Sequence, residues 1–283
     1  MVFIWKFNRL RMKYLNGIID SVQRGTSYDA DAAAFFARVT AAGGTLTNTE
    51  KSSVNTLVIS LKANSIWNTL TAIYPMVGAS AAACSQNLNS SSYTGTFSGG
   101  WVYASTGVKA NGTNGYFNTN LQADTAGIDS NNCCYSVYSR TNIAEDSIEM
   151  GFARNSVTAW VYYHIRVTTT FLSYTYLGTY PTNLINYTNP DSLGFYNICR
   201  TSSNLMTTYK NGVSKGTNTT NTTYSYNAPP TLTFSAFNYF SGPQNFSTRE
   251  NAFSSVGSGL SDAQSATFYT IVQNFQTLLS RQV

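Results

Sequence analysis

Two runs of alternating apolar residues meet at Asn211-Gly212, and this junction restricts the fold of the 283-residue chain more than any other feature. Asn and Gly both tolerate the positive φ angles that a tight two-residue turn requires. Residues 192–218 are therefore predicted to form an antiparallel hairpin. A hairpin of this kind needs further strands to bury its apolar face, so the chain is expected to be rich in antiparallel sheet.

The composition favours the same architecture. Aromatic residues make up 14% of the chain, whereas charged residues make up only 10%. Tyr, Thr, Ser and Asn suit half-buried strands and the turns between them. Turn residues recur about every ten positions from 85 to 256, which is typical of a β-sandwich. The strands are predicted at 133–140, 147–154, 157–168, 170–177, 193–200, 205–210, 213–217 and 231–239.

Helices are predicted on both sides of this β region. Residues 27–42 are rich in Ala and end at two glycines, and Thr47 and Glu50 form a capping box that begins a second helix. A further helical turn is predicted from Ile66 to Ile73, before Pro75. Near the C-terminus, another capping box begins at Ser261 and precedes an amphipathic helix.

These patterns divide the chain into four segments. Residues 1–26 form an N-terminal attachment arm, and residues 27–80 form a helical neck or collar. Residues 81–258 form the β-sandwich. Residues 259–283 form a helix that is expected to pack on the sandwich or on a neighbouring subunit.

The positive charge of the chain is concentrated in the arm. The net charge is +5, and residues 1–24 contain five basic residues and one acid, which leaves +4 there. The rest is nearly neutral, so a nucleic-acid-binding surface is not predicted. The arm alternates these charges with apolar residues, which favours an anchor buried by a partner protein. A membrane-surface helix and an arm folded back on its own body are the alternatives. The predicted attachment residues are Phe3, Trp5, Phe7, Arg9, Leu10 and Arg11.

No signal peptide or membrane span is predicted. The apolar run at Met1–Trp5 is broken by Lys6, and no stretch reaches the roughly 18–20 apolar residues that a spanning helix needs.

The four cysteines are Cys84, Cys133, Cys134 and Cys199. No C-x-x-C spacing occurs, so neither a zinc site nor a redox motif is expected. The favoured interpretation is four reduced thiols that act as small apolar side chains. The alternative is a disulfide from Cys133 or Cys134 to Cys199.

Three segments resemble parts of concanavalin A-like and laminin-G-like domains. Tyr209–Val213 is similar to the Y-x-N-G hairpin of these families, and Gly107–Tyr116 resembles their F-D-G-x-x-D-Y strand with Asn in place of both acids. Leu260–Tyr269 resembles their closing L-S-D-A helix. The resemblance implies a mainly β protein with some α structure: a concanavalin A-like antiparallel sandwich, or jelly roll, with a helical N-terminal region and a closing C-terminal helix.

The segment from Asp29 to Gly78 resembles a helical segment that precedes a jelly roll in virion structural proteins of tailed phages infecting Bacteroidetes. The resemblance implies a non-enzymatic fibre, tail, spike or capsid-decorating subunit on the particle surface. Its partners would be other virion proteins, contacted through the arm, and further copies in a dimer or trimer.

No catalytic site, cofactor or metal site is predicted. The glucanase motif E-x-D-x-x-E aligns with residues 144–149, but Ala144 replaces the nucleophile. Glu145 is expected to point to the opposite face of the strand, because successive strand residues alternate. His164, the only histidine, is interpreted as a strand-face residue. A degenerate glucanase is the third-ranked function.

Carbohydrate binding is the remaining hypothesis. Lectin sites combine an aromatic platform with amide and hydroxyl groups, and this chain has many Tyr and Asn residues. The predicted glycan-binding residues are Trp101, Tyr103, Trp160 and Tyr162. They fit a host-surface glycan contacted by a virion protein, or a soluble lectin-like protein as the alternative function.

Overall fold

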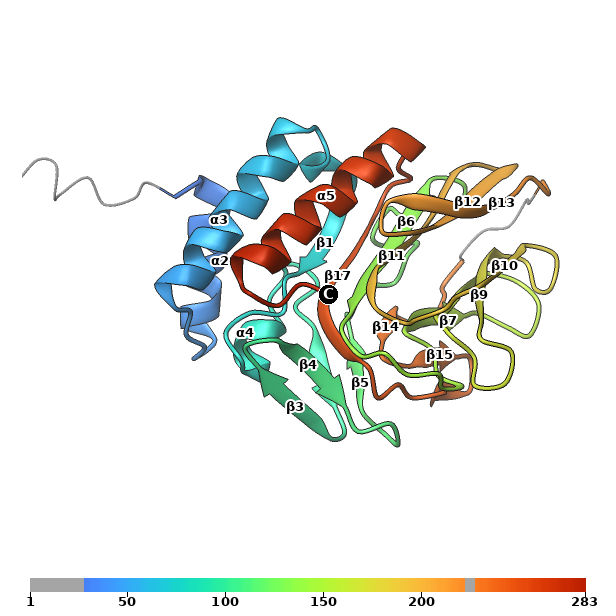
Figure 1. Ribbon diagram of the computed structural model, residues 1–283, viewed down its shortest axis with the longest axis horizontal. Coiled ribbons are helices and arrows are strands. Elements are labelled where there is room, and N and C mark those ends of the chain that lie inside the picture. Colours follow the sequence, from blue (N-terminus) through green and yellow to red (C-terminus); the bar gives the residue numbers. More distant parts are fainter. Residues whose placement is uncertain (1–27, 222–226) are drawn as a thin grey trace, which may run out of the picture.

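The computed structural model describes residues 28–221 and 227–283, which form three layers (Figure 1). A layer of helices covers one face of sheet A, and the other face of sheet A packs on sheet B. The prediction of an antiparallel β-sandwich with an N-terminal helical region and a closing C-terminal helix is confirmed. The helices are α2 (Ala30–Ala41), α3 (Asn48–Ala63), α4 (Ala81–Cys84) and α5 (Asp262–Leu278), with a short 3-10 helix η1 (Trp67–Thr69).

Sheet A has the strand order β13-β12-β11-β6-β17-β4-β3, and β1 also pairs with β17. Its strands are β1 (Leu70–Tyr74), β3 (Trp101–Ala104), β4 (Gly107–Ala110), β6 (Cys133–Ser139), β11 (Gly194–Ser202), β12 (Leu205–Lys210), β13 (Val213–Asn218) and β17 (Glu250–Gly257).

Sheet B has the order β10-β9-β8-β7-β14-β5-β2, and the β15–β16 hairpin joins it alongside β7. Its strands are β2 (Thr96–Ser98), β5 (Tyr116–Asn118), β7 (Met150–Ala153), β8 (Trp160–His164), β9 (Leu172–Gly178), β10 (Leu184–Thr188), β14 (Thr233–Phe234), β15 (Phe237–Tyr239) and β16 (Gly242–Gln244).

The hairpin predicted at Asn211-Gly212 joins β12 to β13. Both turn residues have positive φ, 52° and 72°, and Lys210 pairs directly with Val213. The Asn211 side chain also accepts a hydrogen bond from the Phe195 backbone at 2.8 Å, which ties the turn to β11. Asn at this position therefore both permits the turn and attaches it to the sheet.

Both predicted capping boxes are present. Thr47 and Glu50 exchange hydrogen bonds at the start of α3, and Ser261 and Gln264 do so at the start of α5. Helix α5 packs on sheet A, where Phe268 meets Phe195 and Phe253 with ring centroids 5.2 and 6.0 Å apart. Residues of α2, α3 and α5 share one hydrophobic core with sheet A.

The predicted helical turn from Ile66 to Ile73 is wrong. Only η1 is helical there, and β1 follows it as a strand paired with β17. Ile73 lies in the core beneath the helices, whereas Tyr74 lies in the core between the sheets. A strand buried on both faces reads as a continuous apolar run, and such a run cannot be told from a short helix by its pattern.

The expectation of four reduced thiols is also wrong. Cys134 and Cys199 lie directly opposite each other on β6 and β11, with their Cα atoms 4.0 Å apart, and form a disulfide. Cys84 and Cys133 are buried and lie outside this bond. Vicinal cysteines on a strand face opposite sides, so only Cys134 of the pair shares a face with Cys199.

The predicted attachment residues Phe3 to Arg11 lie outside the described residues. Within the part of the chain that the structure describes, no helix is both long and apolar enough to cross a membrane.

The disulfide gives a thiol count that can be measured. Denatured but unreduced protein should react with two equivalents of a thiol reagent, and reduced protein with four. The reason is that Cys134 and Cys199 form a disulfide, whereas Cys84 and Cys133 do not. A Cys84→Ala variant should lower both counts by one. Four reactive thiols before reduction would contradict the bond.

Candidate functional site

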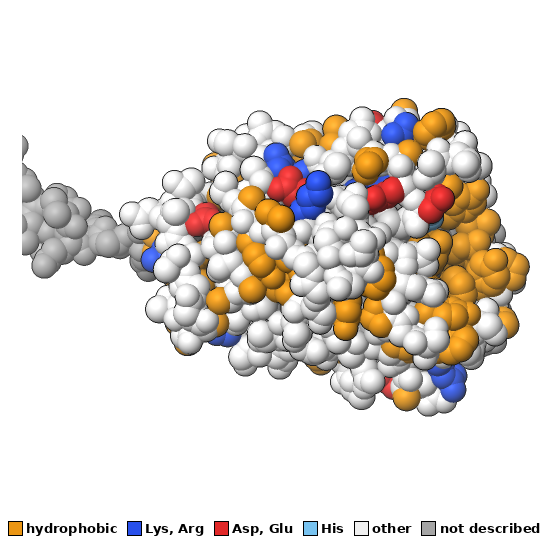
Figure 2. All heavy atoms as spheres, turned by 90° about the horizontal axis from the view of Figure 1, so that it is seen from below, with side chains coloured by type: hydrophobic (Ala, Val, Ile, Leu, Met, Phe, Trp, Pro, Cys, Tyr) orange, Lys and Arg blue, Asp and Glu red, His pale blue; other side chains and the backbone are white. Residues whose placement is uncertain are grey.

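An aromatic cleft of about 540 Å³ lies on the outer face of sheet B, away from the helices. The space-filling view shows hydrophobic side chains gathered at the end of the molecule where sheet B lies (Figure 2). The volume is within the range of roughly 300–1,000 Å³ that is usual for small-ligand sites. The cleft is lined by Trp160, Tyr162, His164, Val167, Tyr174, Tyr176, Tyr180, Phe237, Tyr239, Gln244 and Asn245.

Strand alternation explains why these side chains share one face. On β8, Trp160, Tyr162 and His164 line the cleft, whereas Val161 and Tyr163 between them enter the core that joins the two sheets. Successive strand residues point to opposite faces, so the sequence W-V-Y-Y-H supplies a core row and a cleft row at once.

Pairing with the neighbouring strands extends the cleft row sideways. Tyr162 pairs with Tyr176 on β9 and with Gly151 on β7. A Cβ atom at Gly151 would lie 3.1 Å from the Phe237 ring and 2.1 Å from the Val161 carbonyl oxygen. The absence of a side chain at Gly151 therefore lets the Phe237 ring of β15 lie close against the sheet beside Tyr162.

Trp160 is the centre of the aromatic cluster. Its ring stacks on Tyr180, with centroids 4.6 Å apart and planes inclined by 20°, and it contacts Phe237 at 5.2 Å. Trp160 itself is only 9% exposed, whereas Tyr180 is 40% exposed. Tyr180 thus presents an aromatic ring to solvent, supported from behind by an indole. Burial raises the pKa of Tyr176 to about 12, so its hydroxyl is protonated near neutral pH.

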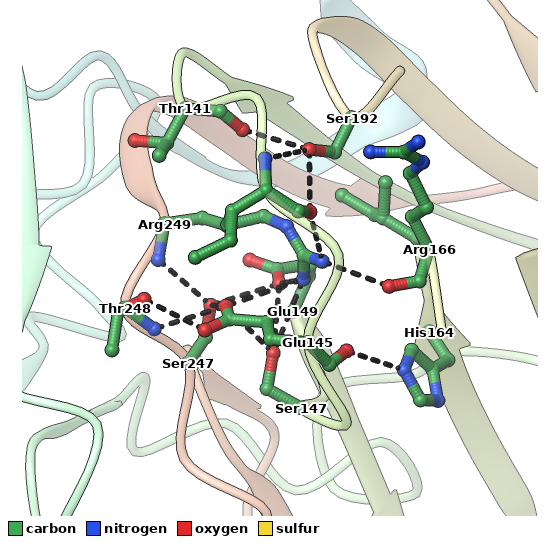
Figure 3. Close-up of polar contacts among 12 residues, drawn as sticks. Thr141, Glu145, Ser147, Glu149, His164, Arg166, Ser192, Ser247, Thr248 and Arg249 are labelled. Atoms are coloured by element: carbon green, nitrogen blue, oxygen red, sulfur yellow. Dashed lines mark hydrogen bonds and ion pairs between the residues drawn. The ribbon is translucent and has the colours of Figure 1, made fainter. Parts of the chain in front are cut away.

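His164 connects the cleft to a buried polar network (Figure 3). Its Nε2 lies 2.8 Å from the carbonyl oxygen of Glu145. A carbonyl only accepts hydrogen bonds, so Nε2 carries the proton. Burial lowers the pKa of His164, which keeps the ring neutral near pH 7 and leaves its other nitrogen as an acceptor.

Arg249 is the centre of that network. Its guanidinium donates to the Glu149 carboxylate and to the carbonyl oxygens of Ile143 and Arg166, and it lies 3.4 Å from a carboxylate oxygen of Glu145. The Ser247 hydroxyl is within hydrogen-bond distance of both carboxylates. One buried cation thereby joins three separate segments of the chain.

Glu145, Ser147 and Glu149 come before β7, which begins at Met150, and all three contact Arg249. Residues two apart lie on one face of an extended segment, so these contacts fit the expected alternation, which sets Glu145 on the face opposite Ala144. Burial raises the pKa of Glu149. Burial acts on Glu145 in the same direction, but the Arg249 charge and hydroxyl donors lower its pKa overall. Both carboxylates are engaged in an internal ion cluster.

The four predicted glycan-binding residues fall at two places. Trp160 and Tyr162 lie together in the cleft, whereas Trp101 and Tyr103 lie on β3 at the edge of sheet A and pack on Phe97. Trp101 lines a different hollow. The structure thus brings together two of the four, and their role stays a prediction.

Sequence reasoning missed most of the cleft. The alternating pattern of β9 could have indicated Tyr174 and Tyr176, because it repeats the pattern of β8. Nothing in the sequence indicated Phe237 and Tyr239, which come from β15, more than seventy residues beyond β8. Across residues 28–221 and 227–283, no group of three or more His, Cys, Asp or Glu side chains could hold a metal ion.

Comparisons with known proteins bear on the fold. No protein-family model matches the sequence. No curated protein matches it. A solved structure of domain 4 of AbnA, a GH43 extracellular arabinanase from Geobacillus stearothermophilus, in complex with arabinotriose, is similar at 14% identity and a TM-score of 0.52, covering 71% of this chain and 98% of that one. This likeness supports the β-sandwich fold.

Two further solved structures are more distant. The binding domain of botulinum neurotoxin serotype D matches with a TM-score of 0.48 at 11% identity, over 73% of this chain and 52% of that one. The NanB sialidase from Streptococcus pneumoniae matches with a TM-score of 0.40 at 11% identity, over 48% of this chain and 24% of that one.

Removing the buried cation should destabilise the protein strongly. In Arg249→Met, two carboxylates lose their partner inside the protein, so the free energy of unfolding should fall by about 3–5 kcal/mol. Lys62→Met is the control, because Lys62 pairs with Asp29 and Asp31 near the surface and should cost about 1 kcal/mol or less. Urea denaturation measures both. An equal loss of unfolding free energy in the two variants would contradict the role of Arg249 as a buried cation that stabilises the fold.

His164 should make stability depend on pH. Its pKa in the folded protein lies below the ordinary value of 6.5, so as the pH falls through 6.5 the unfolded chain takes up a proton before the folded protein does. Stability is therefore lost on acidification, by up to about 1.36 kcal/mol per pH unit from this group. His164→Gln should flatten the dependence between about pH 7.5 and 5.5. An unchanged slope in urea denaturation would contradict the lowered pKa.

Proposed function

We propose that this chain is a carbohydrate-binding β-sandwich domain whose ligand occupies the aromatic cleft of sheet B. The observation that carries the proposal is the cleft itself: aromatic rings flanked by His164, Gln244, Asn245 and several Tyr hydroxyls. A sugar ring has an apolar C–H face and a polar hydroxyl edge. The apolar face fits an aromatic platform, and the hydroxyl edge fits convergent hydrogen-bonding groups.

The exposed ring of Tyr180 supports this interpretation. Tyr180 is 40% exposed as a residue, and its ring is stacked on Trp160, so it is a supported platform that loses little conformational freedom when a ligand covers it. The similar arabinanase domain was solved with arabinotriose, which makes a neutral oligosaccharide the first ligand class to test.

We further propose that the site binds glycans without cleaving them. The two carboxylates closest to the glucanase motif, Glu145 and Glu149, are paired with Arg249, and Glu149 is fully buried. A retaining glycosidase needs two carboxylates that reach the same sugar bond. In this arrangement the carboxylates stabilise the chain that supports the cleft.

The biological setting that we propose is the surface of a phage particle. The resemblance of residues 29–78 to helical segments of phage virion proteins supports it, as does the concentration of positive charge and apolar residues in the N-terminal arm. The arm would attach the protein to a capsid or tail partner, and a dimer or trimer would present several clefts to host surface glycans. A soluble lectin-like protein is the alternative.

Substitution within the cleft tests the binding proposal. Tyr180→Ala removes the exposed platform and should weaken glycan binding about tenfold, roughly 1.4 kcal/mol, in calorimetric titration. Trp101→Ala is the control on β3 and should leave affinity unchanged. The reverse result would move the site to β3, and turnover of the bound glycan would contradict a binding-only role.

Deletion of the arm tests the virion proposal. A chain that lacks residues 1–26 should keep a folded sandwich and its glycan binding but should not associate with purified phage particles, because the predicted anchor is gone. Copies per particle are counted by mass spectrometry, with the full chain as control. Undiminished association would show that another surface attaches the protein.

A further inference from the structure

We propose that the cleft on sheet B selects neutral oligosaccharides, and that the carboxylate of Asp146 at its edge excludes sugars that carry a carboxylate or sulfate group. This inference rests on the proposed function, since it names the class of glycan that the same site accepts. It makes Asp146 a determinant of specificity that the glucanase-like alignment does not indicate.

The lining of the cleft offers no cation to an anionic sugar. Its aromatic, amide and aliphatic side chains are uncharged, and His164 is neutral because burial lowers its pKa. An acidic sugar that enters would lose water around its charge without gaining an ion pair, which is unfavourable. A neutral sugar loses only hydroxyl hydration, which tyrosine and amide groups replace.

Asp146 lies where its charge acts on the cleft. It follows Glu145, whose carbonyl oxygen holds the His164 ring, and its Oδ1 accepts a hydrogen bond from the Thr168 backbone at 3.1 Å, next to the lining residue Val167. The side chain is exposed. Burial is the main cause that raises the pKa of Tyr162, and the negative charge of Asp146 acts in the same direction.

The nearby arginines do not cancel this charge inside the cleft. Arg249 is buried and paired with Glu149 and Glu145. Arg166 donates to the Asn189 carbonyl oxygen and lies over the Phe171 ring at 4.7 Å. Arg154 follows β7 and donates its backbone N–H to Ala159, at the other end of β8 from His164.

Matched pairs of glycans test the proposal with the full-length chain. A glycan array at pH 7.5 would include lactose with 3′-sialyllactose and xylotriose with its glucuronylated form, and calorimetry would then measure each pair that binds. The wild-type protein should bind the neutral member at least about tenfold more tightly. Asp146→Asn should strengthen binding of the acidic member about threefold to tenfold and leave the neutral member within about twofold.

Asp129→Asn is the control variant. Asp129 is also exposed and also accepts a backbone hydrogen bond through Oδ1, from Asn131, but it lies outside the cleft. This variant should leave the ratio of neutral to acidic glycan affinity unchanged in every pair. Raising the salt concentration from about 20 to 500 mM should reduce the difference in affinity between the neutral and acidic glycans for the wild type, since salt screens exposed charges. The reduction should be smaller for Asp146→Asn.

The outcomes separate the two proposals. Equal binding of neutral and acidic members by the wild type, or a ratio that Asp146→Asn does not change, would overturn the selectivity while leaving carbohydrate binding intact. Binding of no glycan on the array by the wild type would overturn the proposed function, and the selectivity with it.

Discussion

The buried pair of Arg249 and Glu149 is the interaction on which the cleft depends. Arg249 lies just before β17 in sheet A, while Glu149 lies just before β7 in sheet B, so the pair joins the two sheets at their ends. The same guanidinium binds carbonyl oxygens of Ile143 and Arg166. These two carbonyl oxygens also accept hydrogen bonds from the Ser192 hydroxyl and the Glu145 backbone N–H, so Arg249 is part of a shared network that holds this irregular segment.

The cleft follows from that support. With residues 141–149 held in place, the Glu145 carbonyl oxygen orients His164, and His164 ends the aromatic row that Trp160 begins on β8. The inward row of the same strand fills the core between the sheets. The core between the sheets and the cleft are therefore built from the two faces of one strand. A change that disturbs the buried network is expected to affect the cleft without touching any residue that lines it.

Local patterns predicted much of the fold. The Asn211-Gly212 turn depends on adjacent residues, and the capping boxes at Thr47 and Ser261 depend on residues three positions apart. The structure contains all three features. The predictions failed where tertiary contacts decide the secondary structure or the cysteine pairing. Residues 66–73 form a strand after a short 3-10 helix because both faces are covered, and Cys134 pairs with Cys199 because β6 and β11 are neighbours.

The sequence by itself determined the sandwich class, its turns, its helix starts and the alternation that places Trp160 and Tyr162 on one face. Backbone propensity and strand period are local properties, so a single sequence expresses them. Only the tertiary structure decided that the distant strand β15 joins sheet B alongside β7. It joined Phe237 and Tyr180 to Trp160, left Trp101 elsewhere, and buried Arg249 between two acids. Contacts across about one hundred residues depend on sheet order and register, which local patterns do not specify.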